Sequence, residues 1–218
     1  MSSALRTVLF DLDGTLADTA PDLAYALNCV RGERGHPALP YTEIRLHVSH
    51  GARALVRLGF GLEPEAPDFE PLRQRLIEVY AANLTRETRL FPGMAELLAG
   101  LEARGLNWGV VTNKPRHLTD PLMAQLGLTP RAACIVSGDT TGNPKPHPEP
   151  MFHACRLAGS EAVECLYVGD AERDIRAGEN AGMRTLVALF GYLGDEDRPQ
   201  SWGADGMVES PLEVLNWL

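Results

Sequence analysis

Apolar residues recur along this chain in two patterns. Short continuous runs bounded by glycine, proline or acidic residues predict buried strands, and apolar residues spaced by three or four predict helices. Strands are predicted at 7–10, 106–112, 134–136, 165–168, 184–189 and 206–208. Helices are predicted between them, at 92–105, 118–126, 149–158 and 172–181. Alternating strands and helices form a parallel sheet with helices on both faces, so we predict a doubly wound, Rossmann-like α/β fold.

The stretch from about residue 18 to 86 departs from this alternation, because its apolar residues keep helical spacing throughout. Leu23, Leu27 and Val30 share one face of a helix that is predicted to begin near Pro21. Further helical segments are predicted at 41–58, with a turn at 48–53, and from 69 to about 84. We therefore predict that an all-helical cap domain, residues 18–86, is inserted into a core domain of residues 1–17 and 87–218.

Composition and charge restrict the partners of the chain. Its 218 residues are 44% hydrophobic, which suits one sizeable core with a modest insertion. The net charge of −9 disfavours nucleic acid and anionic membranes as partners. No apolar run is long enough for a membrane span, and no signal core precedes the first strand. An anionic ligand would therefore need a locally positive pocket.

The cysteines indicate a reducing compartment. Cys29, Cys134, Cys155 and Cys165 include no Cys-X-X-Cys pair and no spacing typical of metal ligands. Two of them open apolar strands, where a free thiol behaves as a small apolar side chain. We expect four reduced thiols and a cytoplasmic protein.

Two aspartates stand directly after the first strand. Asp11 and Asp13 are separated by one residue, and Gly14 lets the chain turn where the strand ends. Strand alternation would place both carboxylates on the same side of the chain, where their charges repel unless a cation lies between them. Mg2+, a hard cation that prefers oxygen ligands, would meet this need. The alternative is a strand followed by an ordinary Asp-Gly turn.

Other predicted strands also end in residues that could do chemistry. Thr112 and Asn113 could hold phosphate oxygens through hydroxyl and backbone N–H groups; alternatively, Thr112 only caps the next helix. Lys145 lies in a loop with three prolines, where its ammonium suits a phosphoryl group, although most loop lysines are simply solvated. Asp170 could ligate a metal with Asp174 behind it, or both could serve the start of a helix.

These residues follow the order of the four motifs of the haloacid dehalogenase (HAD) superfamily. The segment Asp11-Leu12-Asp13-Gly14-Thr15 resembles its first motif, and the other three match Thr112, Lys145 and the segment from Gly169 to Asp174. The resemblance implies that Asp11 attacks phosphorus to form an aspartyl-phosphate. It also implies that Asp13 protonates the leaving oxygen and then takes a proton from water.

The resemblance extends to the ligands of the phosphoryl group and the metal. It implies that Thr112, Asn113 and Lys145 hold phosphoryl oxygens. It further implies that Mg2+ is held by the residues of the first and fourth motifs: Asp11, the backbone carbonyl of Asp13, and Asp170, with Asp174 supporting them from behind. The position of the insertion resembles the helical-cap class of the superfamily, and Asp13 favours its phosphatases and mutases over its dehalogenases.

Further segments resemble two groups of phosphatases. Residues 112–115, 137–139 and 145–148 resemble the phosphoglycolate phosphatases. The cap turn at 51–56 and the segment at 202–205 resemble the N-acetylmuramic acid 6-phosphate phosphatases of bacterial cell-wall recycling. In the cap turn we expect His50, Gly51 and Arg53 to contact substrate, with Arg53 binding a carboxylate; alternatively, Arg53 is only a solvated charge.

The expected function is therefore that of a Mg2+-dependent phosphomonoester hydrolase for a small anionic phosphorylated metabolite, similar to phosphoglycolate phosphatase. N-acetylmuramic acid 6-phosphate is the alternative substrate. A mutase similar to β-phosphoglucomutase is the alternative enzyme, and a metal-binding regulatory scaffold on the same fold is the alternative without catalysis.

Overall fold

The computed structural model of the chain describes residues 4–218. Its centre is a six-stranded sheet in the order β5-β4-β1-β6-β7-β8, in which all neighbouring strands are parallel. The strands are β1 (Thr7–Phe10), β4 (Asn107–Val111), β5 (Cys134–Val136), β6 (Cys165–Gly169), β7 (Arg184–Ala188) and β8 (Gly206–Val208). The predicted doubly wound parallel sheet is thus confirmed.

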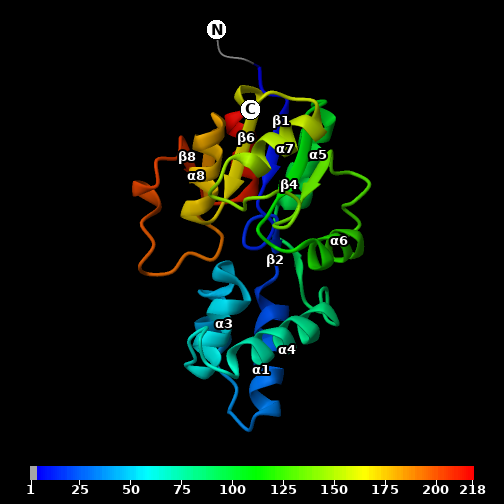
Figure 1. Cartoon of the computed structure of the whole chain (residues 1–218). Helices are drawn as coiled ribbons and strands as arrows, with labels where there is room; N and C mark the ends of the chain where they lie inside the picture. The colour runs from blue at the N-terminus through cyan, green and yellow to red at the C-terminus, as the bar shows by residue number, and fades with distance from the viewer. Residues whose placement is uncertain (1–3) are drawn as a thin grey trace.

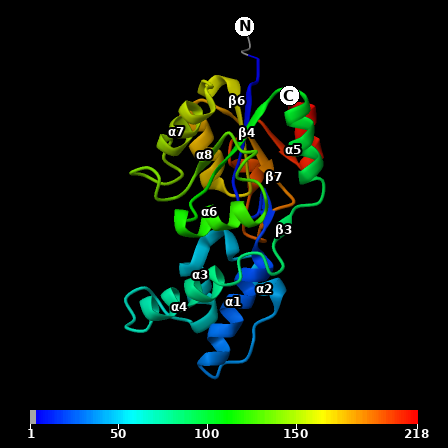
Figure 2. The same ribbon diagram turned by 90° about the vertical axis from the view of Figure 1, so that its right-hand side faces the viewer.

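Helices cover both faces of this sheet (Figure 2). On one face lie α5 (Met94–Ala103) and the 3-10 segment η4 (Pro211–Trp217), and on the other α7 (Glu149–Ala158) and α8 (Glu172–Ala181). Alternation along β1 explains the two layers, because Val8 and Phe10 pack in the same apolar cluster as α5, whereas Leu9 packs with α7 and α8. The remaining elements of this part are α6 (Arg116–Gln125), η2 (Ala162–Glu164) and η3 (Pro199–Ser201).

The segment predicted to be helical forms a separate group of helices below the sheet in Figure 1. It contains α1 (Ala20–Glu33), α2 (Tyr41–Arg45), η1 (Val48–His50), α3 (Gly51–Phe60) and α4 (Phe69–Ala81). Helices α1, α3 and α4 pack against one another around apolar side chains such as Leu27, Leu55 and Leu76, which are fully buried. We call this group the cap. No helix within residues 4–218 is both long and apolar enough to cross a membrane.

A short antiparallel ribbon joins the cap to the rest of the chain. It consists of β2 (Ala17–Asp18) and β3 (Arg89–Leu90), with Ala17 paired to Leu90. Each strand has two residues, which is too short to give a periodic pattern in the sequence. The buried carboxylate of Asp22 holds the segment by which the chain returns from the cap to the sheet. It accepts hydrogen bonds from the backbone of Glu87 and from the backbone and hydroxyl of Thr88.

Candidate active site

The strand order places a crevice at the carboxyl ends of β1 and β6. From β1 the chain proceeds to β4 and β5 on one side, then crosses to β6 on the other. Such a reversal point is where open α/β sheets bind ligands. A cavity of about 420 Å³ lies between this edge and the cap. Core residues that line it include Asp11, Asp13, Thr112, Asn113 and Lys114.

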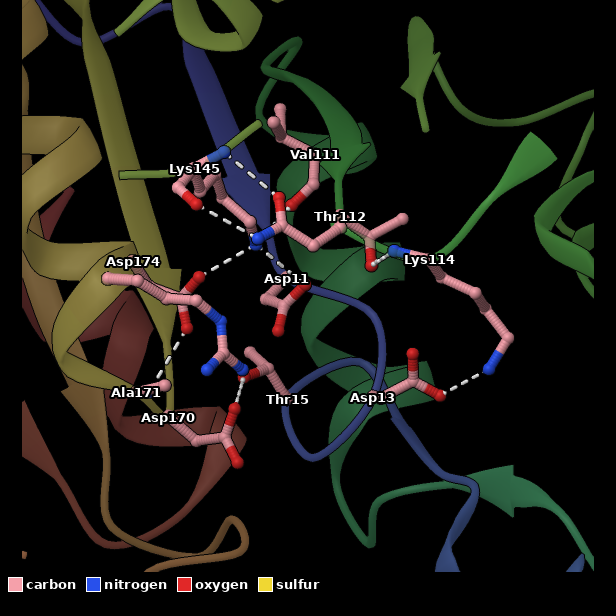
Figure 3. Close-up of polar contacts among 12 residues, drawn as sticks. Asp11, Asp13, Thr15, Val111, Thr112, Lys114, Lys145, Asp170, Ala171 and Asp174 are labelled. Atoms are coloured by element: carbon pink, nitrogen blue, oxygen red, sulfur yellow. Dashed lines mark hydrogen bonds and ion pairs between the residues drawn. The ribbon is translucent and has the colours of Figure 1, made fainter. Parts of the chain in front are cut away.

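Lys145 is buried next to Asp11 (Figure 3). Its Nζ lies 2.8 Å from Oδ1 of Asp11 and 2.7 Å from Oδ1 of Asp174, and it also donates to the Tyr167 hydroxyl and the Val111 carbonyl. Burial by itself lowers the pKa of this ammonium, but the two carboxylates outweigh burial and raise the pKa above its ordinary value. Lys145 therefore stays charged and holds Asp11 in one orientation.

Asn113 holds the loop that carries Lys145. Its Oδ1 accepts a hydrogen bond from the backbone N–H of Lys145 at 2.9 Å, and its Nδ2 donates to the backbone carbonyl of the same residue at 3.0 Å. Both polar atoms of the Asn113 side chain are therefore engaged with the lysine loop. The backbone N–H of Asn113 takes no part in this contact, so it is the Asn113 group that can still serve the predicted binding of phosphate oxygens.

Three buried carboxylates gather at this edge of the sheet. Oxygens of Asp11, Asp170 and Asp174 lie within 4.8 Å of one another. Asp170 accepts hydrogen bonds from the Thr15 hydroxyl, the Ser49 hydroxyl and the Tyr192 backbone N–H, which are all neutral donors. Burial first, and then the charges of Asp11 and Asp174, raise the pKa of Asp170 to about 7.

This cluster fits a hard divalent cation. All its ligand atoms are carboxylate oxygens, and Lys145 pairs with Asp11 and Asp174 but not with Asp170. Gly14 permits the close packing, because its φ is +89° and a Cβ there would lie 2.2 Å from Oδ2 of Asp170. The side chains that meet at the cluster are those of Asp11, Asp170 and Asp174, so Asp13 could contribute only its backbone carbonyl, as the resemblance implies.

The side chain of Asp13 points away from Asp11, which differs from the expectation drawn from strand alternation (Figure 3). Its Oδ1 accepts hydrogen bonds from Lys114 Nζ at 2.7 Å and from the Thr19 hydroxyl at 2.5 Å. The physical reason is that β1 ends at Phe10 and the chain then turns, so the two-residue period no longer applies. Each aspartate of the first motif is therefore paired with its own buried lysine.

Sequence reasoning gave no role to Lys114. A signal was nevertheless present in the composition, because the 20 lysines and arginines of the chain comprise 18 arginines and two lysines, Lys114 and Lys145. Both lysines follow core strands and precede a proline, and both are buried against an aspartate of the first motif. A chain that uses arginine elsewhere has placed its only lysines at this site.

The structure distinguishes the alternative roles of Thr112, Asp170 and Asp174. Thr112 Oγ1 accepts the backbone N–H of Lys114 at 3.1 Å, whereas α6 begins at Arg116, so Thr112 shapes the loop rather than capping the helix. Asp170 does not cap α8 either. Asp174 caps the start of α8, since its Oδ2 accepts a hydrogen bond from the Ala171 N–H. Its Oδ1 accepts a hydrogen bond from Lys145.

The cap contributes one wall of the cavity. Its lining residues include the three predicted from the cap turn, His50, Gly51 and Arg53. Ser49 in the same turn touches the core directly, because its hydroxyl donates to Oδ2 of Asp170 at 3.0 Å and its carbonyl accepts from Arg173. Helix α4, from a segment for which the sequence predicted only a helix, supplies further lining residues: Arg73, Leu76, Ile77 and Tyr80.

The family model of haloacid dehalogenase-like hydrolases matches residues 8–188. The chain belongs to this family. The match confirms the family resemblance inferred from the strand-end residues, and it spans the sheet strands β1 to β7 together with the inserted cap of this HAD-like hydrolase.

Several relatives of this HAD-like hydrolase carry the names of specific phosphatases. An N-acetylmuramic acid 6-phosphate phosphatase from Pseudomonas putida is 47% identical over 210 residues, covering 96% of this chain and 94% of the relative. A phosphoglycolate phosphatase from Xanthomonas campestris is 44% identical with the same coverage of both chains. Among solved structures, a predicted phosphoglycolate phosphatase from Haemophilus somnus matches with a TM-score of 0.87 and 26% identity, covering 99% of this chain and 98% of that one.

Proposed function

We propose that this chain is a Mg2+-dependent phosphomonoester hydrolase that works through an aspartyl-phosphate on Asp11. The observation that carries the proposal is the placement of Asp11: a carboxylate that lines the cavity, fixed by a buried ammonium and adjacent to Asp170. A fixed carboxylate beside a cation site can attack a phosphoryl group once the charge repulsion between the two anions is screened.

Asp11 would bond to phosphorus through the carboxylate oxygen that Lys145 does not hold. Thr112 and the backbone N–H groups of its loop would hold the phosphoryl oxygens, and Lys145 would keep Asp11 from rotating. Asp13 would protonate the oxygen that leaves phosphorus, and it would then take a proton from the water that hydrolyses the acyl phosphate. Mg2+ bound by Asp11, Asp170 and the Asp13 carbonyl would supply positive charge beside the transferred group.

For the substrate, we propose N-acetylmuramic acid 6-phosphate first and 2-phosphoglycolate second. The 420 Å³ cavity has an apolar wall from Leu76, Ile77 and Leu118 and two arginines from the cap, Arg53 and Arg73. A sugar phosphate with a carboxylate would occupy this space more completely than the short phosphoglycolate. Relatives with both names match over nearly the whole chain, which supports keeping both substrates. Four free thiols support the cytoplasm as the place of action.

Phosphate release from a panel of phosphorylated metabolites tests this proposal. The panel contains both candidate substrates, an aryl phosphate and a sugar phosphate without a carboxylate, each with Mg2+ and with EDTA. We expect Mg2+-dependent release that is fastest for a carboxylated substrate. Conversion of glucose 1-phosphate to its isomer without phosphate release would favour the mutase alternative, and no turnover of any substrate would favour the scaffold.

Replacing Arg53 by alanine is expected to change substrate preference. If the guanidinium binds the substrate carboxylate, kcat/KM for the carboxylated substrate should fall. The fall should correspond to a loss of about 1–3 kcal/mol in transition-state stabilisation, the usual loss for a charged hydrogen bond. Hydrolysis of an aryl phosphate should change far less. Arg57→Ala is the matched control, because Arg57 lies one turn further along α3 and pairs with Glu63 instead. Equal losses on both substrates would show that Arg53 does not read the carboxylate.

Mg2+ is expected to stabilise the protein more at pH 8 than at pH 5. The pKa of Asp170 is raised to about 7 in the folded protein, mainly by burial, against about 3.9 in an unfolded chain. The folded protein therefore binds more protons than the unfolded chain between these values, so the free energy of unfolding falls as the pH rises through them. Bound Mg2+ offsets this loss at pH 8 and competes with the proton at pH 5. Thermal unfolding with and without Mg2+ at both pH values measures the effect, and equal shifts would contradict it.

A further inference from the structure

The carboxylate of Asp13 is held on one side only. Oδ1 accepts both of its hydrogen bonds, from Lys114 at 2.7 Å and from Thr19 at 2.5 Å, and no group within residues 4–218 donates to Oδ2. Because Asp13 also lines the cavity, Oδ2 is the oxygen left for a substrate or a water molecule. The contacts at Oδ1 therefore decide where the free oxygen lies.

Lys114 is itself fixed by the cap. Its Nζ donates to the hydroxyl of Tyr80 at 2.9 Å and lies 4.5 Å from the centre of the Tyr80 ring. Lys114 and Tyr80 are both buried, and Tyr80 belongs to α4 of the cap whereas Lys114 belongs to the loop after β4. Burial by itself lowers the pKa of Lys114, but the charges and hydrogen bonds of Asp13 and Tyr80 together outweigh burial and raise it, so this ammonium stays charged.

The three side chains therefore form one connected unit across the two parts of the molecule. Asp13 comes from the loop after β1, Lys114 from the loop after β4, and Tyr80 from a helix of the cap. An ammonium can only donate hydrogen bonds, so when it is buried it needs nearby acceptors. For Lys114 these acceptors are Asp13 and the Tyr80 hydroxyl. If the cap moved away, Lys114 would lose the Tyr80 oxygen and the aromatic ring at once, and its hold on Asp13 would loosen.

We propose that Lys114 and Tyr80 are positioning residues for Asp13, which place its free oxygen for proton transfer only while α4 covers the site. This inference rests on the proposed function, since it takes Asp13 as the proton donor and acceptor. In the first step the bond from Asp11 to phosphorus forms, the bond from phosphorus to the leaving oxygen breaks, and the proton of the Asp13 carboxylic acid moves to that oxygen. In the second, a water oxygen bonds to phosphorus, the bond from Asp11 to phosphorus breaks, and the Asp13 carboxylate takes a proton from the water.

The dependence of rate on the leaving group tests the proposal. An alkoxide leaves poorly without a proton, whereas p-nitrophenolate leaves readily as the anion, so in the first step only the alkyl phosphate needs a well-placed Asp13. The ratio kcat/KM reports this step, whereas hydrolysis of the aspartyl-phosphate is common to both substrates. We expect Lys114→Met to lower kcat/KM for the best alkyl phosphate by roughly 10- to 100-fold, part of the 10²–10⁴-fold typical of acid–base catalysis. With p-nitrophenyl phosphate the loss of kcat/KM should stay within about threefold.

Two further variants separate positioning from folding. Tyr80→Phe removes one oxygen and keeps the ring, so it should fold and show the same selective loss at smaller size. Lys114→Arg retains the charge and should recover part of the alkyl phosphate rate. Tyr25→Phe is the matched control, because Tyr25 is an exposed tyrosine of the cap; it should leave both rates unchanged.

The results distinguish failure of this inference from failure of the proposed function. Asp13→Asn should show a larger selective loss on the alkyl phosphate; if it does not, the acid–base role of Asp13 is itself wrong. Suppose instead that Asp13→Asn behaves as expected, but Lys114→Met and Tyr80→Phe lower kcat/KM equally for both substrates, or for neither. The positioning role is then overturned, and the proposed function stands.

Discussion

Replacing Asp11 by asparagine is expected to abolish turnover while the protein remains folded. The amide has nearly the same shape as the carboxylate but is a very poor nucleophile, so phosphate release should fall by at least about 10⁴-fold. The fold should survive because Lys145 keeps Asp174, Tyr167 and the Val111 carbonyl as acceptors. The substitution also removes a negative charge that crowds Asp170.

The measurement combines phosphate release with thermal unfolding. In metal-free buffer the midpoint for Asp11→Asn should equal or exceed that of the wild type, because three buried carboxylates become two. Asp120→Asn, an exposed aspartate on α6, is the matched control and should retain full activity. Hydrolysis by Asp11→Asn within tenfold of the wild type would rule out Asp11 as the nucleophile.

Replacing Lys145 by methionine is expected to give the largest loss of stability. Methionine fills similar space, but Asp11 and Asp174 would lose the ammonium that lies between them with 1% of its side chain exposed. Breaking a buried ion pair from one side lowers the free energy of unfolding by about 3–5 kcal/mol. Activity should fall as well, because Asp11 would no longer be held in place.

Urea unfolding in metal-free buffer measures this loss, and repeating it with Mg2+ shows whether a divalent cation can partly replace the ammonium. Arg176→Met is the matched control, because Arg176 is half-exposed and pairs with Glu172 at the surface of α8; it should change the free energy of unfolding by less than about 1 kcal/mol. A Lys145→Met protein as stable as the wild type without metal would contradict the role assigned to this lysine.

The sequence allowed the sheet and the strand-end residues to be predicted because both depend on local patterns. The run at Thr7–Phe10 is buried throughout, and β1, β4 and β6 are each followed directly in the chain by a polar residue. The parallel arrangement then brings these residues to one edge. Asp11, Thr112 and Asp170 could therefore be placed together without coordinates.

Side-chain partners could not be predicted in the same way. The divergence of Asp13 from Asp11 depends on a turn after Phe10, where strand alternation ceases to apply. The contact of Lys114 with Tyr80 joins segments 34 residues apart, and it depends on how α4 packs over the core. The amide of Asn113 is engaged by the backbone of Lys145, a contact that no residue spacing reveals.

The concentration of both lysines at one site makes the protein well suited to spectroscopic study. Lysine is the only residue type here that carries a side-chain amine, so isotope labelling of lysine should give two side-chain signals in a nuclear magnetic resonance spectrum. One signal, from Lys145, would respond when the charge on Asp11 changes, and the other, from Lys114, when Asp13 gains or loses a proton. The two halves of the reaction could thus be followed separately in a single sample.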